Sequence, residues 1–148
     1  MLAVFDVDGT LLDSRRSIVV AMDAAFVALG LPAPGYAATR QIVGLSLEPA
    51  IAALAPDLPQ ARYAALAKAY QEAFVANRAA GLSEPLYDGA EGLLRALRAE
   101  GWHLGIATGK SRRGLSAFLD RTGLADWFDT GFCADDGPGK PNPHMLQL

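Results

Sequence analysis

The chain has 148 residues, of which 51% are hydrophobic and 20% charged. That composition is typical of a folded globular protein and excludes a disordered chain, and the length suits one domain or a small core with an insertion. The net charge of −3, without a long Lys/Arg run, argues against a nucleic-acid partner.

The first predicted element is a short apolar strand, Leu2–Phe5, which we expect to be buried. This strand is not preceded by a basic leader and is not part of a long apolar stretch. We therefore expect no signal peptide, no membrane span and a cytoplasmic location. The single cysteine, Cys133, excludes an internal disulfide and a multi-cysteine zinc site. Its apolar neighbours predict a buried side chain.

The stretch 15–84 predicts helices and loops with no good strand. Helical spacing of apolar residues, stop signals at glycines and one proline at a helix start define these helices. They are predicted over 15–29 with Ser14 as the cap, over 39–43 and 46–54, and from Pro59 to near Gly81.

From Pro85 onward, helices and strands alternate, which predicts βαβ units and a parallel sheet. An amphipathic helix ends at Gly101, and a second helix, capped by Ser111, ends at Gly123. The predicted strands are Trp102–Ala107 and Thr130–Ala134.

These patterns predict a Rossmann-like, three-layer α/β/α core with a parallel sheet, built from residues 1–14 and 85–148. An all-helical cap, residues 15–84, is inserted after the first strand. Asn142 and Pro143 form a helix start, but too few residues follow for a stable helix. The sequence therefore predicts a core that is truncated at its C-terminus, a partial form of a larger fold.

Asp6 and Asp8 lie two residues apart at the carboxyl end of the first strand, where ligand sites of open α/β sheets gather. Two nearby carboxylates repel each other and favour a hard cation such as Mg²⁺. The alternative is a solvated Asp-Gly turn of a hairpin.

Two further loops carry polar groups after strands. Thr108, Gly109 and Lys110 precede a helix start and could cradle an anion, or form an ordinary strand-to-helix turn. Lys140 follows the third strand and precedes two prolines, Pro141 and Pro143, which restrict the backbone. It could neutralise a phosphate and a carboxylate, or be a solvated loop lysine. Together the three strand ends supply a nucleophile, a hydroxyl and a cation, the groups that phosphoryl transfer requires.

The motifs resemble those of the haloacid dehalogenase superfamily, in its phosphoglycolate-phosphatase-like branch with an α-helical cap. Asp6–Ser14 is similar to the first motif, Thr108–Lys110 to the second and Gly139–Pro143 to the third. The resemblance covers essentially the whole chain and implies a phosphomonoester hydrolase acting on a small phosphorylated metabolite. Asp8 favours phosphoryl chemistry over dehalogenation, because a halide needs no acid to leave.

The resemblance also implies roles. Asp6 attacks phosphorus and forms an aspartyl-phosphate, and Asp8 acts as acid and then as base. Thr108 and the Gly109 amide hold the phosphoryl group, while Lys140 stabilises charge on it and on Asp6. The Asp6 carboxylate and the Asp8 carbonyl bind Mg²⁺. The remaining implied substrate-binding residues are Gly9, Thr10, Lys110 and Arg40.

One departure from the family pattern concerns a fourth motif, an acidic pair, which nothing after Lys140 matches. Asp135 and Asp136 precede that lysine and are interpreted as loop acids near the substrate entrance. The chain could thus bind Mg²⁺ poorly and turn over slowly or not at all.

The cap stretch with Arg40, Gly44 and Ser46 resembles the family's substrate-specificity region, and Arg40 could meet a substrate carboxylate or second phosphate. The alternative, which we favour, is a surface arginine on a helix. His103 and His144 have no metal-ligand spacing and are interpreted as structural. A phosphosugar mutase of the same fold and a non-catalytic fragment remain alternatives to the hydrolase. We expect a monomer or a homodimer.

Overall fold

A computed structural model describes residues 1–147 of the chain, which group into two compact units. The α/β unit comprises residues 1–12, Gly44–Ser46 and the chain from Leu86 onward, and the helical unit comprises residues 13–43 and 47–85. Both boundaries fall close to the predicted ones. The segment Gly44–Ser46, hereafter the strap, was predicted to belong to the cap but groups with the α/β unit.

The α/β unit contains a parallel sheet of three strands in the order β1-β2-β3, which confirms the predicted fold class. Leu2 pairs with His103, and Gly105 pairs with Thr130. Since β1 and β2 are parallel, the hairpin alternative for the loop after β1 is wrong. The strands are β1 (Leu2–Phe5), β2 (His103–Ala107) and β3 (Thr130–Phe132).

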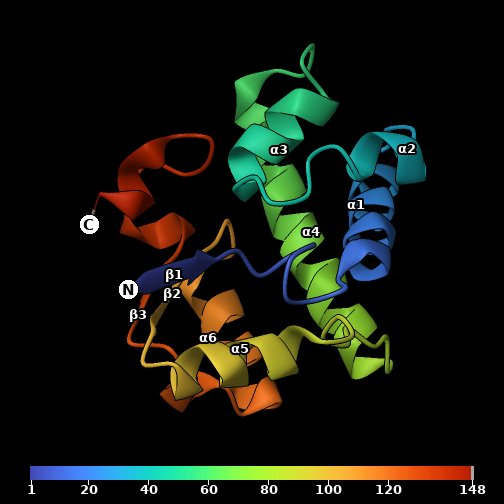
Figure 1. Cartoon of the computed structure of the whole chain (residues 1–148). Coiled ribbons are helices and arrows are strands. Elements are labelled where there is room, and N and C mark those ends of the chain that lie inside the picture. Colours follow the sequence, from blue (N-terminus) through green and yellow to red (C-terminus); the bar gives the residue numbers. More distant parts are fainter. Residues whose placement is uncertain (148) are drawn as a thin grey trace. The chain divides into compact units, whose positions relative to one another are not determined.

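Helices α5 (Ala90–Ala99) and α6 (Arg112–Thr122) cover the sheet face that carries Leu104 and Ile106 (Figure 1). Leu94 of α5 and Phe118 of α6 are buried in this core. The alternate residues of β1 point to the other face, where Leu2 is 59% and Val4 43% exposed. The prediction of a buried first strand was wrong, because only Ala3 and Phe5 face the core under α5 and α6, whereas Leu2 and Val4 point to the opposite face.

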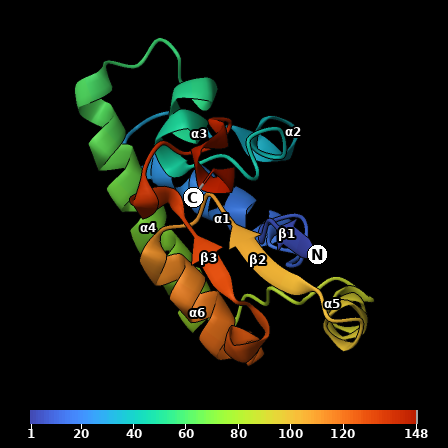
Figure 2. The ribbon, with the colours of Figure 1, turned by 60° about the vertical axis from the view of Figure 1, so that its left-hand side comes forward.

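The helical unit is built on α1 (Arg15–Ala28) and α4 (Tyr63–Ala79), which pack side by side (Figures 1 and 2). An apolar face on each helix explains this packing, since Met22 and Phe26 of α1 and Leu66 of α4 are buried. The remaining helices are α2 (Gly35–Thr39), α3 (Leu47–Leu54) and the 3₁₀ turn η1 (Gln60–Arg62).

The predicted helix over 39–43 was wrong: α2 ends at Thr39, and turns follow up to Gly44. One contact accounts for the earlier start. The Gly35 N–H donates to Asp23 of α1, which anchors the start of α2 four residues earlier than predicted. The turns after α2 reach Gly44, whose φ of +94° is not helical.

The two connections between the units run antiparallel. In the α/β unit Leu12 bridges Leu86, and in the helical unit the Asp13 N–H donates to the Pro85 carbonyl over 2.8 Å. Near the chain end, Asn142 accepts from the His144 N–H and starts a 3₁₀ helix, Pro143–Leu146. Across residues 1–147, the helices are too short or too polar to cross a membrane.

Candidate active site

The carboxyl ends of the three strands bring Asp6 and Lys140 together in the α/β unit. Lys140 Nζ lies 2.9 Å from Asp6 Oδ2, and the two side chains are 27% and 21% exposed. The other carboxylate oxygen, Asp6 Oδ1, accepts from the Val7 N–H over 2.7 Å. Lys140 is therefore not a freely solvated loop lysine, and its charge stabilises the carboxylate predicted to act as nucleophile.

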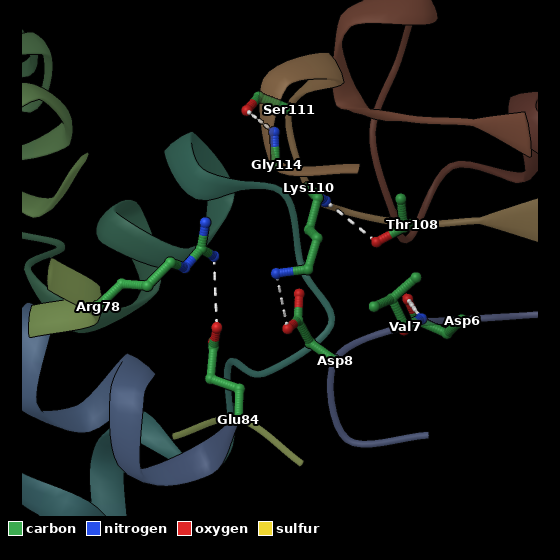
Figure 3. Close-up of polar contacts among 9 residues, drawn as sticks. All are labelled: Asp6, Val7, Asp8, Arg78, Glu84, Thr108, Lys110, Ser111 and Gly114. Atoms are coloured by element: carbon green, nitrogen blue, oxygen red, sulfur yellow. Dashed lines mark hydrogen bonds and ion pairs between the residues drawn. The ribbon is translucent and has the colours of Figure 1, made fainter. Parts of the chain in front are cut away.

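Asp8 is paired with a lysine of its own. Lys110 Nζ lies 2.9 Å from Asp8 Oδ1, and the side chains are 10% and 12% exposed. The Lys110 backbone N–H donates to Thr108 Oγ1 over 3.2 Å, so one residue contacts the loops after both β1 and β2 (Figure 3). The sequence predicted Lys110 as a substrate-binding residue and missed its contact with Asp8.

The chain turns sharply after Asp8, which explains how both carboxylates remain near the strand end. The Val7 carbonyl accepts from three successive N–H groups, among them Leu11 at 3.0 Å, and Gly9 adopts a φ of +77°. Gly9 and Thr10 are exposed at this turn. Their assignment to substrate binding stays a prediction.

Thr108 and Gly109 lie where β2 passes into α6. Thr108 is fully buried, and its N–H donates to the Phe132 carbonyl of β3 over 3.0 Å. Ser111 caps α6 by accepting from the Gly114 N–H, as predicted. The buried hydroxyl and the helix N-terminus thus stand at the same strand end.

Asp135 and Asp136 hold this loop to the end of β3, a role that the sequence did not predict. Asp136 accepts from the Arg112 guanidinium and from the Cys133 N–H, while Asp135 accepts from the Arg112 N–H. The Cys133 N–H bond, followed by Arg112, lowers the pKa of Asp136, and the bond to Asp136 raises the pKa of Arg112. The two acids are therefore structural acceptors at the start of α6.

The oxygen donors of Asp6 and Asp8 suit Mg²⁺, which commonly binds one or two carboxylates and leaves other positions to phosphate and water. Within residues 1–147 no three or more His, Cys, Asp or Glu residues cluster in a way that could hold a metal ion. The residues present fit Mg²⁺ as a partial ligand set. Further protein ligands would have to come from outside this group.

The surroundings of the cysteine and the two histidines match a structural role. Cys133 is buried, as predicted, and burial raises the pKa of its thiol. His144 packs on Gly137, where an added Cβ atom would lie 2.6 Å from Nε2. His103 is 71% exposed beside Asp129.

Arg40 follows α2 in the helical unit with an exposed side chain, and its assignment to substrate binding stays a prediction. Gly44 and Ser46 of the strap lie in the α/β unit instead. The signal that could have placed them there is the presence of glycines at positions 44, 109 and 139, whose close contacts are described below.

Comparison with known proteins gives consistent results. The sequence model of the family described as "Haloacid dehalogenase-like hydrolase" matches residues 3–148. The chain is 35% identical to "Probable phosphatase IndB" of Dickeya dadantii, over 97% of this chain and 64% of that protein. It is 33% identical to a phosphoglycolate phosphatase of Vibrio cholerae, over 98% of this chain and 67% of that enzyme.

Among solved structures, a haloacid dehalogenase-like hydrolase of Bacteroides fragilis superposes with a TM-score of 0.87 at 25% identity. The match covers 99% of this chain and 70% of that protein. This chain spans roughly two thirds of the length of such relatives, 64% for the Dickeya protein.

Proposed function

This chain belongs to the haloacid dehalogenase-like hydrolases, and from that membership we propose that it carries the phosphoryl-transfer site of a phosphomonoester hydrolase. The observation that supports the proposal most directly is the ion pair between Asp6 Oδ2 and Lys140 Nζ at 2.9 Å. It joins a predicted nucleophile to a cation from another strand end. Such a pair places a positive charge beside the carboxylate that would attack phosphorus.

In the proposed reaction, an Asp6 carboxylate oxygen attacks phosphorus while the bond from phosphorus to the ester oxygen breaks. Asp8 gives a proton to the departing oxygen, which leaves as an alcohol. Asp8 then takes a proton from water, which attacks the aspartyl-phosphate and releases inorganic phosphate with Asp6 restored. Lys110, 2.9 Å from Asp8 Oδ1, orients that carboxylate.

Thr108 and the Gly109 amide are proposed to hold the phosphoryl oxygens, next to the N-terminus of α6. The Asp6 carboxylate and the Asp8 main-chain carbonyl would hold Mg²⁺, which supplies positive charge to the transferring phosphoryl group. The proposed substrate is a small organic phosphate resembling phosphoglycolate, in a cytoplasmic protein that is a monomer or homodimer. The name of the Vibrio cholerae relative, a phosphoglycolate phosphatase, supports the proposed substrate class.

The test is hydrolysis of a chromogenic aryl phosphate with and without Mg²⁺, beside the variant Asp6→Asn. We expect kcat to fall roughly 10³-fold or more, because an amide oxygen is a poor nucleophile. Asp126→Asn, which alters an exposed aspartate in a 3₁₀ turn, is the matched control and should keep full activity. Equal rates for Asp6→Asn and the unaltered chain would rule out Asp6 as the nucleophile.

A mutase is distinguished by a second assay, in which a sugar phosphate replaces the aryl phosphate and the phosphoryl group is followed. Hydrolysis releases inorganic phosphate in step with the alcohol, whereas a mutase would return the phosphoryl group to a sugar phosphate without releasing it.

Rapid acid quench and mass spectrometry should find one added phosphoryl group on the peptide that contains Asp6. The Asp6→Asn chain should lack it.

A further inference from the structure

The strap is seated in the α/β unit by glycines of two loops. A Cβ atom added to Gly109 would lie 2.5 Å from the Leu45 carbonyl oxygen. A Cβ atom added to Gly139 would lie 2.0 Å from Ser46 Oγ and 2.7 Å from Ser46 Cβ. Side chains at both positions are therefore incompatible with the observed place of the strap.

The strap also reaches the first strand end. Gly44 has a φ of +94°, and a Cβ atom added to it would lie 3.2 Å from Asp6 Oδ2. Main chain thus passes beside the predicted nucleophile where a larger residue would crowd the carboxylate. The three consecutive residues of the strap therefore approach one site loop each.

Each of the two seating glycines adjoins a residue of the candidate site. Gly109 lies between Thr108 and Lys110, and Gly139 directly precedes Lys140. A displacement of the strap at Gly139 would therefore move the backbone that carries the Lys140 ammonium. The pairing of Lys140 with Asp6 depends on that backbone position.

The Ser46 side chain packs against Gly139 through its shape and not through hydrogen bonds. Ser46 is 7% exposed, and its Oγ has no hydrogen-bond partner within the part of the chain that the structure describes. Burying an unpaired hydroxyl is unfavourable, so polar bonding does not explain its position. The hydroxymethyl group occupies the space that the absent Gly139 side chain leaves.

We propose that the Ser46 side chain (the peg) packs into the space left by the missing side chain of Gly139 (the notch) and so fixes the position of the strap. The strap in this position in turn holds Lys140 against Asp6. Ser46 and Gly139 are then positioning residues, since neither has to touch the reacting atoms. The seating is independent of the reaction, whereas its catalytic consequence rests on the proposed phosphatase function.

The test is a cycle of three variants: Gly139→Ala, Ser46→Gly and both together. The added methyl group of Gly139→Ala overlaps Ser46, so the strap should be displaced. The backbone amides of residues 43–47 should exchange hydrogen at least about 10-fold faster, because a displaced strap protects them less. Where turnover is measured, kcat should fall roughly 10-fold or more with KM changed less than about 3-fold.

The double variant is the decisive measurement. Ser46→Gly removes both atoms that the new methyl group meets, so the double variant should recover exchange protection and kcat to within about 3-fold of Ser46→Gly alone. Ser46→Gly by itself introduces no overlap and should fold, with protection factors lowered only in the strap. This variant tests the peg even where Gly139→Ala does not fold.

Gly92→Ala is the matched glycine control. Gly92 is exposed in α5, and a Cβ atom added there meets nothing within 4 Å. Exchange in the strap and kcat should both stay at their original values in this variant.

Unchanged strap protection in Ser46→Gly, or a double variant as impaired as Gly139→Ala, would overturn the seating proposal. The exchange measurement does not depend on catalysis. A chain without activity but with normal exchange protection in the strap would count against the proposed function and leave the packing proposal standing. A displaced strap with full kcat would overturn the role of the strap in positioning Lys140.

Discussion

Each unit contains an arginine–carboxylate pair that joins separate segments, and the two pairs differ in burial. In the helical unit Arg78 of α4 lies 3.3 Å from Glu84, whose side chain is 1% exposed. In the α/β unit Arg112 and Asp136 pair with side chains 50% and 25% exposed. In the first pair only the carboxylate is buried, since the Arg78 side chain is 32% exposed, whereas the second pair is joined by further hydrogen bonds to the backbone.

The comparison separates two ways of holding a chain segment. A buried pair is costly to break, because the remaining charge has lost its water. An exposed pair contributes little by its charge alone but can fix geometry through several hydrogen bonds. The candidate site adjoins the pair of the second kind, since the Ala134 N–H next to Asp135 donates to the Lys110 carbonyl over 2.8 Å.

The largest effect is expected from Arg78→Met. Removing the guanidinium leaves the Glu84 carboxylate in a buried place with weaker compensation, which should cost roughly 3 kcal/mol of unfolding free energy. The measurement is urea unfolding followed by circular dichroism, with hydrogen exchange of α4 as a local readout.

Two variants sharpen this measurement. Adding Glu84→Gln to Arg78→Met should restore most of the loss, because the amide carries no charge. Lys68→Met breaks an exposed pair with Glu72, 78% and 68% exposed, and should change stability by less than about 0.5 kcal/mol. Similar losses for Arg78→Met and Lys68→Met would show that burial does not distinguish the pairs.

An intermediate effect is expected from Asp136→Asn. The Cys133 N–H and Arg112 lower the pKa of Asp136 in the folded chain, so its stabilisation is present above the unfolded pKa of about 3.9. It is lost as the pH falls through the lower folded pKa. We expect about 1 kcal/mol of destabilisation at pH 7, and the gap from the unaltered chain should close below about pH 4.

Urea unfolding at a series of pH values measures this gap. Asp120→Asn in α6 alters an exposed aspartate of the same unit and serves as the control. A gap that persists unchanged at the lowest pH would show that the Asp136 charge is not the stabilising feature. Slower phosphatase turnover at pH 7 in Asp136→Asn would connect the Arg112 pair to the Lys110 loop.

The sequence predicted those parts of the molecule that local pattern determines. Alternating helices and strands identified the parallel sheet, and Ser111 and Gly123 marked the ends of α6. Asp6 and Lys140 could be placed at strand ends, which a parallel sheet brings to one edge. Their ion pair is the consequence of that topology.

The remainder depends on tertiary contacts that leave no local signal. The sequence placed Lys110 at the site as a substrate-binding residue, but nothing in the local pattern shows its pairing with Asp8. The strap was assigned to the cap because it lies between helical segments, yet its seat depends on Gly109 and Gly139, far away in sequence. The exposed face of β1 was missed because an apolar run does not reveal whether both faces of the sheet are covered.

The smallest effect is expected from Asp129→Asn, which tests a carboxylate more exposed than Asp136. Asp129 Oδ2 accepts from the Leu104 N–H over 2.9 Å, and this bond lowers the pKa of Asp129. The side chain is 44% exposed, so solvent screens its charge. Asparagine keeps an oxygen that can accept the same bond, and only the charge is lost.

The unfolding temperature of Asp129→Asn should therefore fall less than that of Asp136→Asn at neutral pH. Since the folded pKa is lowered, the difference from the unaltered chain should vanish as the pH falls below about 4. Moderate salt should already reduce it at pH 7, because an exposed charge is screened within about 10 Å at 0.1 M. A loss as large as that of Asp136→Asn, and insensitive to salt, would mean that exposure to solvent does not weaken the contribution of the Asp129 charge.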